Sequence, residues 1–225
     1  MTVAALFADY WPSLAAFGAF GLLHSVGAQE PFKNALARWT GPFFVDHFWR
    51  LVYCALSYLA LYYGIAALHW ARNTDNDLWL FVYPGWLWQV VTFIHLGSIA
   101  LMYIAFLQSD YLEFLGIKQA GRGVHSLIAR LPKRPELELF GTHRLVVDGV
   151  YGWVRHPMLV AGLLFLLTSG PSLNNIIYTA MYLAYMLIGG YYEERRLIRI
   201  FGDDYLRYRR RVGTFTPRLQ RRPAD

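Results

Sequence analysis

Apolar residues fall into five blocks along this chain of 225 residues, with polar stretches between them. The blocks cover residues 5–27, 45–69, 79–107, 157–170 and 174–192. A helix needs about 20 mostly apolar residues to cross a hydrocarbon core about 30 Å thick. The first three blocks reach about that length, and the whole pattern predicts about five membrane-spanning helices.

The last two blocks are shorter and are joined by SGPSLNN, which carries turn-forming residues. This spacing predicts a tight antiparallel helical hairpin, with Pro157 in the first turn of its first helix. Both ends of such a hairpin return to the same side of the membrane. Arg155 and His156, just before it, are therefore expected to meet the charged run 193–196, just after it. The preceding segment, GTHRLVVDGVYG, is expected to wrap against that end of the hairpin.

The composition supports a membrane protein, because 56% of the residues are hydrophobic and only 16% are charged, against about 25% charged in soluble domains. The predicted fold is all-α and polytopic, with a helical hairpin near the carboxyl terminus. One integral membrane domain is expected over 1–225. Its parts are three spans in 1–107, a cytoplasmic loop in 108–156, the hairpin in 157–192 and a basic tail in 193–225.

The basic residues predict the orientation in the membrane. With five spans, all but one of the 21 lysines and arginines lie on the side of the carboxyl terminus, and Arg72 alone lies opposite. The positive-inside rule then places the loop and tail in the cytoplasm and the amino terminus outside, in a bacterial inner membrane. The first block lacks a basic region and a cleavage site before it, so it is expected to be a retained span.

The charge pattern also bears on partners. A basic tail is typical of attachment to anionic lipid headgroups, and the lipid bilayer is the expected partner. Nucleic acid is not expected despite a pI near 9.5, because the charges lie against a membrane and form no recognised nucleic-acid fold. No obligatory protein partner is predicted. A channel or transporter is disfavoured, since the charges gather at one face instead of along a path through the middle.

The sequence gives little support for a disulfide or a metal site. Cys54 is the single cysteine, which excludes an intramolecular disulfide and a multi-thiolate metal site. The seven histidines show no i, i+3 or i, i+4 pair that would place two ligands on one helix face. No metal site is therefore predicted.

Polar groups within or beside the spans are the candidate functional residues, because they are costly there. His24 is a candidate substrate contact, and His95 is expected to be a buried histidine hydrogen-bonded between helices. An ion pair between Arg155 and Glu193 or Glu194 could simply anchor two helix ends. Exposed ion pairs contribute only about 0–1 kcal/mol to stability, which is a weak reason to gather so many polar groups. A ligand site is therefore the second interpretation.

Two ordered motifs near the carboxyl terminus carry a resemblance to a known family. The runs HRLVVDGVYGWVRHPMLVAG (143–162) and EERRLIRIFGDDYLRYRRRV (193–212) resemble the signature of the isoprenylcysteine carboxyl methyltransferase superfamily, which includes phospholipid methyltransferases. DYLEFLGIKQ, GTHRLVVDG and GLLHSVGA are similar to the methanethiol S-methyltransferase branch, close to NnrU-type proteins. The resemblance implies an integral membrane enzyme that uses S-adenosyl-L-methionine and releases S-adenosyl-L-homocysteine. It also implies a cytoplasmic cofactor-binding cap, in which the hairpin and its preceding loop enclose the cofactor.

The resemblance also implies which positions contact the cofactor. They are His143, Arg144, Leu145, Val146, Tyr151, His156, Pro157, Met158, Leu159 and Glu193. An acid such as Glu193 suits the ammonium group of this zwitterionic cofactor, and imidazole or backbone donors suit its carboxylate. Tyr151 can offer an aromatic face near the adenine or the sulfonium.

The expected reaction is methyl transfer to a small thiol, such as methanethiol giving dimethyl sulfide, or to another lipophilic acceptor. The thiolate is the nucleophile, and Arg155, with His24 or Arg50, could favour that anion. Glu194 is the fourth catalytic candidate.

Two departures bear on the substrate. Gly189 stands where isoprenylcysteine enzymes carry an arginine, and Leu159 replaces the tyrosine of the usual RHPxYxG pattern, with the glycine one position later. Both disfavour a prenylated carboxylate substrate. The alternatives are phospholipid N-methylation, isoprenylcysteine-type carboxyl methylation and a non-catalytic NnrU-like membrane protein of nitrogen-oxide metabolism.

Overall fold

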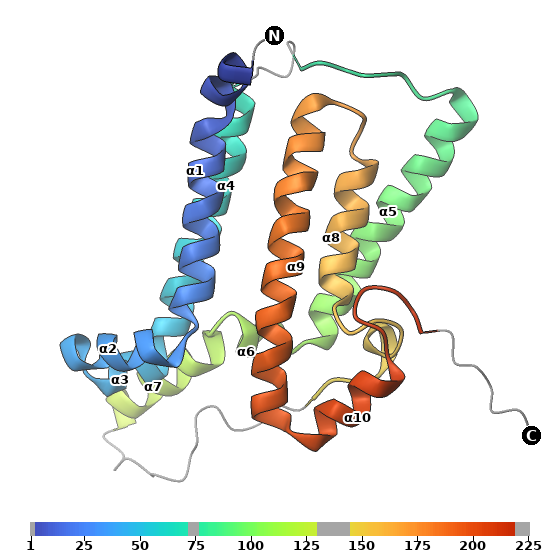
Figure 1. Cartoon of the computed structure of the whole chain (residues 1–225). Helices are drawn as coiled ribbons and strands as arrows, with labels where there is room; N and C mark the ends of the chain where they lie inside the picture. The colour runs from blue at the N-terminus through green and yellow to red at the C-terminus, as the bar shows by residue number, and fades with distance from the viewer. Residues whose placement is uncertain (1–2, 72–76, 130–144, 219–225) are drawn as a thin grey trace, which may run out of the picture. The chain divides into compact units, whose positions relative to one another are not determined.

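The computed structural model describes residues 3–71, 77–129 and 145–218, and these residues are largely helical (Figure 1). The helices are α1 (Val3–Gly27), α2 (Glu30–Thr40), α3 (Pro42–Phe44), the π-helix η1 (Val45–Trp49), α4 (Arg50–Ala71), α5 (Gly85–Gln108), α6 (Tyr111–Phe114), α7 (Ile117–Ala129), the 3₁₀-helix η3 (Gly149–Gly152), α8 (Pro157–Thr168), α9 (Leu173–Phe201) and α10 (Asp203–Arg211). Within these ranges extended pairing is limited to two isolated bridges. The predicted all-α class is confirmed.

The chain divides into two compact units. Unit 1 comprises residues 1–76 and 110–143, and unit 2 comprises residues 77–109 and 144–225. The expectation of a single membrane domain over 1–225 stays a prediction.

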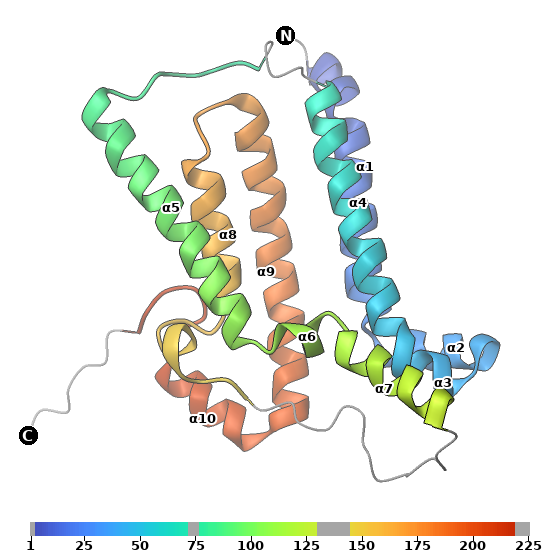
Figure 2. The same ribbon diagram turned by 180° about the vertical axis from the view of Figure 1, so that it is seen from behind.

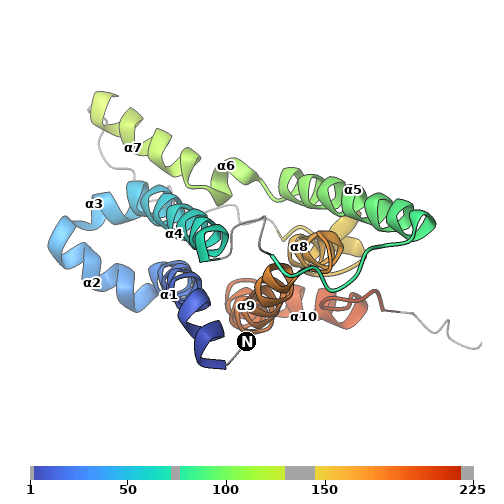
Figure 3. The same ribbon diagram turned by 90° about the horizontal axis from the view of Figure 1, so that it is seen from above.

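Unit 1 is built on α1 and α4, which lie side by side with opposite directions (Figure 3). Small residues permit the close approach: a Cβ at Gly64 would lie 3.5 Å from the Cβ of Ala16, and one at Gly27 would lie 3.4 Å from the Cβ of Tyr53. At one end of this pair, η1 packs on α7. There Gly123 leaves room for His47, since a Cβ at Gly123 would lie 2.7 Å from the Cβ of His47.

Unit 2 contains α5 and the hairpin of α8 and α9, with α5 packed on α8 (Figure 2). The turn of the hairpin pairs with the segment before α5: Leu80 N donates to Pro171 O at 2.9 Å, and Leu173 N donates to Leu78 O at 3.0 Å. Farther along, His95 Nδ1 lies 3.0 Å from Thr168 Oγ1. The prediction that His95 is hydrogen-bonded between helices is therefore confirmed.

Three predicted boundaries differ from the structure. The block expected at 79–107 is helical only from Gly85, because Pro84 is the N-cap with a non-helical backbone and Leu78 and Leu80 pair with the hairpin turn. The block expected at 157–170 ends at Thr168. The block expected at 174–192 continues to Phe201, since the charged run 193–196 extends the helix until Gly202, whose φ of +51° ends it.

α5 is the one helix among the described residues that is long and apolar enough to cross a membrane, judged by length and composition. Only 11% of its most apolar window is buried, and Phe93, for example, is 79% exposed. A core helix of a soluble protein hides such a surface. The exposure agrees with membrane association, whereas the number of spans stays a prediction.

Candidate functional site

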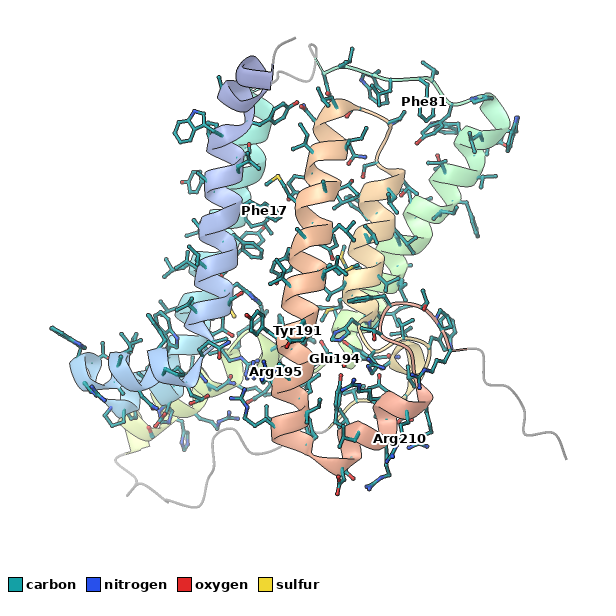
Figure 4. All side chains as sticks on the ribbon, viewed as in Figure 1. Phe17, Phe81, Tyr191, Glu194, Arg195 and Arg210 are labelled. Atoms are coloured by element: carbon teal, nitrogen blue, oxygen red, sulfur yellow. The ribbon has the colours of Figure 1, made fainter. Side chains whose placement is uncertain are left out.

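The candidate site lies in unit 2, at the end of the hairpin where α8 begins and α9 carries its charged run (Figure 4). Three segments meet there: the turn before α8, the α9 stretch around Glu194, and α10 with the residues that follow it. The prediction that the two polar clusters flanking the hairpin meet is confirmed, because Arg155 Nε lies 2.7 Å from Glu194 Oε1.

Arg155 is buried, with 8% of its surface exposed, and its guanidinium group joins all three segments. Besides its bond to Glu194, Nη1 donates to the carbonyl oxygens of Val212 at 2.5 Å and Arg209 at 3.3 Å. Nη2 donates to Thr214 Oγ1 at 2.6 Å. A buried charge is tolerated only when it is paired and hydrogen-bonded, and Arg155 meets that condition fully.

Glu194 collects three donors on one oxygen. Its Oε1 accepts from Arg155 Nε at 2.7 Å, from the Tyr205 hydroxyl at 2.9 Å and from His156 Nε2 at 3.2 Å. Burial alone would raise the pKa of this carboxyl, but the hydrogen bonds from Arg155 and Tyr205 outweigh burial and lower its pKa. Glu194 is therefore held as a carboxylate.

His156 lies between the two adjacent glutamates. Its Nε2 faces Glu194, and its Nδ1 lies 3.2 Å from Glu193 Oε2. Burial works to lower the pKa of His156, but the hydrogen bonds and charges of Glu193 and Glu194 raise it above its usual value. Because each ring nitrogen faces a carboxylate, the doubly protonated imidazolium is the form that donates to both.

The two glutamates differ sharply in exposure. The side chain of Glu193 is 53% exposed, whereas that of Glu194 is 13% exposed. Consecutive helix positions point about 100° apart, since a turn has 3.6 residues. Only Glu193 therefore presents a substantial carboxylate surface for a ligand.

Helix α10 supplies two buried tyrosines to this end of the hairpin. The Tyr205 hydroxyl donates to Glu194, and the Tyr208 hydroxyl donates to the carbonyl oxygen of Tyr151 at 2.6 Å. Tyr205, Tyr208 and Val212 form an apolar cluster against which Leu145 packs. The expectation that the segment before α8 wraps against this end of the hairpin is confirmed for the part that the structure describes.

Tyr151, a predicted cofactor contact, is anchored at both its backbone and its side chain. Its hydroxyl lies 3.3 Å from the carbonyl oxygen of Ala105. Desolvation by burial, with the nearby charge of Glu193, raises the pKa of Tyr151 to about 12. The phenol is therefore neutral at physiological pH and can act as a hydrogen-bond donor.

The residues after α10 form a strap against the turn before α8; we call residues 212–216 the strap. Gly213 pairs with Val154 in an isolated parallel bridge. The backbone N–H of Arg155 donates to Gly213 O at 2.8 Å, and that of His156 donates to Thr214 O at 3.3 Å. The strap thereby fixes the backbone from which both predicted site side chains project.

Phe215 of the strap covers one side of His156, with ring centroids 5.7 Å apart. Its ring also lies over Gly190 of α9, where a Cβ would be 3.1 Å from Phe215 Cζ. A larger residue at Gly190 would force this ring to shift.

The first turns of α8 hold three more predicted cofactor contacts. Pro157 is buried at the first helical position, as expected, and Met158 and Leu159 follow it. The Tyr182 hydroxyl of α9 donates to Leu159 O at 3.1 Å. The close approach of the Tyr182 side chain to α8 requires a glycine at position 162, because a Cβ at Gly162 would overlap the Tyr182 hydroxyl oxygen.

The remaining predicted residues lie elsewhere or outside the description. His143 and Arg144 are outside the described residues, while Val146 lies in the described segment before η3. His24 and Arg50 belong to unit 1. Arg50 Nε donates to Phe114 O at 2.9 Å there. The roles assigned to all these residues stay predictions.

Sequence reasoning missed four residues that complete the network: Tyr205, Tyr208, Thr214 and Phe215. The two tyrosines had a readable signal, because their spacing of three places both on one face of a helix. Thr214 and Phe215 lie in an irregular segment, and no helical periodicity marks them.

The sequence that builds this hairpin matches a known family. The chain matches the family described as NnrU protein over residues 14–219. It belongs to the NnrU family, and the resemblance noted from the motifs is confirmed.

Curated relatives cover most of the chain. Methanethiol S-methyltransferase of Pseudomonas deceptionensis is 30% identical over 208 residues, which are 92% of this chain and 72% of that protein. Methanethiol S-methyltransferase of Mycobacterium tuberculosis is 28% identical over 211 residues, 91% of this chain and 77% of that protein. Protein-S-isoprenylcysteine O-methyltransferase of Mus musculus is 35% identical over 80 residues, 34% of this chain and 28% of that protein. No solved structure matches the chain.

Proposed function

We propose that this chain is a membrane methyltransferase that uses S-adenosyl-L-methionine and methylates a small thiol. The observation that carries the proposal is the meeting of Arg155, His156, Glu193 and Glu194 at one end of the α8–α9 hairpin. The relatives named methanethiol S-methyltransferase support the reaction class and the acceptor.

The residues present fit the amino-acid end of this cofactor. Glu193 offers an exposed carboxylate for an ammonium group, and the His156 imidazolium donates to that carboxylate and fixes its position. Tyr151, Pro157, Met158 and Leu159 would line the rest of the cofactor, together with Leu145, Val146, His143 and Arg144.

When bound, S-adenosyl-L-methionine supplies an electrophilic methyl group on a positively charged sulfur. A thiolate acceptor would take this methyl group, and S-adenosyl-L-homocysteine would leave with the electron pair of the broken carbon–sulfur bond. The thiol proton leaves before the attack, since the thiolate is the nucleophile. The chain's task is then alignment of the two sulfur atoms and exclusion of water.

The proposed setting is the bacterial inner membrane, with the amino terminus outside and the site at the cytoplasmic interface. The exposed apolar surface of α5 and the basic residues that follow α9 support this arrangement. From Leu173 to Glu193, α9 rises about 30 Å at 1.5 Å per residue, which equals the thickness of a hydrocarbon core. A lipophilic acceptor would arrive through the bilayer and the polar cofactor through the cytoplasm. That His24, Arg50 and Arg155 favour the thiolate stays a prediction from the sequence.

The test is methyl transfer by purified protein in lipid nanodiscs supplied with radiolabelled S-adenosyl-L-methionine. The acceptors are methanethiol, aminophospholipid and a prenylcysteine, each alone. We expect label in volatile dimethyl sulfide. Label in phospholipid or in a prenylcysteine ester would replace the proposed acceptor with that one. Absence of cofactor binding by calorimetry would overturn the enzyme and favour a non-catalytic membrane protein.

A matched pair of variants controls this assay. Glu193→Gln removes the exposed carboxylate and should weaken cofactor binding by about tenfold or more, as expected for a hydrogen bond between charged groups. Asp204→Asn makes the same chemical change at an exposed position of α10, where Asp204 pairs with Arg207, and should leave binding unchanged. Equal affinities for the two variants would remove Glu193 from the cofactor site.

A further inference from the structure

The adjacent glutamates make very different contacts, although both stand in the predicted site. Glu194 Oε1 accepts three hydrogen bonds, from Arg155, Tyr205 and His156. Its Oε2 lies 3.8 Å from Arg209 Nε. A carboxylate oxygen surrounded by donors of its own chain has little capacity left for a ligand.

His156 connects the two glutamates. Its Nε2 faces Glu194 Oε1 and its Nδ1 faces Glu193 Oε2, both at 3.2 Å. A histidine ring that is hydrogen-bonded at one nitrogen is oriented at the other. The orientation of Nδ1 toward the exposed side therefore depends on Glu194.

Tyr205 supports this arrangement from α10. It is 1% exposed, and its hydroxyl lies 2.9 Å from Glu194 Oε1. The charged and titratable groups around His156 are thus Glu193 and Glu194 on α9, Arg155 beside it, and Tyr205 and Arg209 on α10, with the Phe215 ring of the strap against one side.

We infer that Glu194 is a positioning residue, held by Arg155 and Tyr205, and that it acts on the ligand only through His156, whose Nδ1 it directs toward the exposed Glu193. This inference rests on the proposed function for the identity of the ligand. It differs from the sequence-based assignment of Glu194 as a catalytic residue, since it gives Glu193 alone the direct carboxylate contact.

The inference explains why α10 belongs to the site. Its arginines suit a membrane surface, but the two buried tyrosines face the other way, one toward Glu194 and one toward the backbone of Tyr151. α10 therefore links the membrane-facing tail to the geometry of the ligand site.

A double-mutant cycle tests this inference. His156→Asn retains an amide near the position of Nδ1 and removes the atom that faces Glu194, so it cuts the link while keeping a group beside Glu193. Tyr205→Phe removes one donor from Glu194 and keeps the buried ring. Tyr191→Phe is the matched control on α9, because its side chain is exposed and its hydroxyl accepts a long hydrogen bond, at 3.4 Å, from the exposed Arg195.

The ligand probe is S-adenosyl-L-methionine, measured by calorimetry in nanodiscs. Tyr205→Phe should weaken its binding at least about twofold in the native background, the low end of coupling within one hydrogen-bond network, and should have no effect beside His156→Asn. Tyr191→Phe should leave cofactor binding unchanged in both backgrounds. A Tyr205→Phe effect of equal size in both backgrounds would overturn the inference, because Glu194 would then act without His156.

A second readout needs no ligand. Nitrogen NMR of histidine-labelled protein reports the Nε2 and Nδ1 environments of His156, assigned by its loss in His156→Asn. Tyr205→Phe should shift the Nε2 signal, whereas Tyr191→Phe should not. An unshifted Nε2 signal in folded Tyr205→Phe protein would refute the positioning role. Because this arm uses ligand-free protein, it decides the inference even if cofactor binding, and with it the proposed function, fails.

Discussion

Arg155→Ala is the substitution for which the structure predicts the clearest loss of stability. It removes the donor to Glu194, two donations to the backbone around the end of α10 and one donation to Thr214 of the strap. Removing one partner of a buried ion pair costs about 3–5 kcal/mol. Glu194 keeps its bonds to His156 and Tyr205, so we place the cost near the lower end, at about 3 kcal/mol.

Because Arg155 links the hairpin to α10, the loss of stability should appear as local opening of α10. About 3 kcal/mol corresponds to a roughly hundredfold larger open population. Trypsin reports this opening, since it cleaves at the arginines of α10 only when the helix opens, and its rate follows the open population when closing is fast. The assay uses detergent-solubilised protein, with fragments identified by mass.

Arg195→Ala is the control, because Arg195 is exposed and its contact with the Tyr191 hydroxyl is long, at 3.4 Å. Exposed substitutions of this kind change stability by within about 0.5 kcal/mol, so cleavage in α10 should stay within about twofold of the native rate. If Arg155→Ala protein were cleaved in α10 at the native rate, the argument that Arg155 clamps α10 to the hairpin would be wrong.

Three further predictions concern the same region. Gly162→Ala should lower the melting temperature, because the new methyl group would overlap the Tyr182 hydroxyl; an unchanged melt measured by circular dichroism would contradict that packing. Gly213→Ala should likewise destabilise the strap, since its Cβ would collide with backbone, and faster tryptic cleavage after α10 is the readout. Because the pKa of His156 is raised, its contribution to folding stability is complete below its ordinary pKa of 6.5 and is lost as the pH rises through its folded pKa. Because the pKa of Glu194 is lowered, its contribution is complete above its ordinary pKa of 4.5 and is lost as the pH falls through its folded pKa. Melting temperature should therefore be highest between pH 4.5 and 6.5, and a steady rise to pH 8 would contradict this assignment.

Much of the local architecture could be predicted from the order of residues. The turn signal between the last two apolar blocks predicts the hairpin, and antiparallel geometry then requires its two ends to meet. The meeting of Arg155 with one of the two glutamates follows from that geometry, and Pro157 at the start of α8 follows from the preference of proline for the first helical turn. His95 was assigned correctly because a polar ring in an apolar helix must find a partner on a neighbour.

Helix boundaries were harder to predict because hydrophobicity does not separate a helix from an extended apolar segment. Residues 79–84 are as apolar as the helix that follows, yet they are not helical, and Trp79 and Leu80 pair with the hairpin turn. α9 continues past the apolar block at 174–192 through the charged run 193–196, since charged side chains extend a helix as readily as apolar ones do.

The sequence alone determined the features that follow from residue periodicity and turn signals, which are the helices, the turn between α8 and α9, and the meeting of the two ends of that hairpin. Only the tertiary structure decided how the polar groups divide their contacts. Hydrogen bonding depends on direction and on distances of about 3 Å, and these are set by the strap and by α10, which reach Arg155 and Glu194 from more than ten residues away in the chain. Adjacent glutamates look alike in a sequence, but their helix positions point them to different surroundings, and that difference makes one buried and the other exposed.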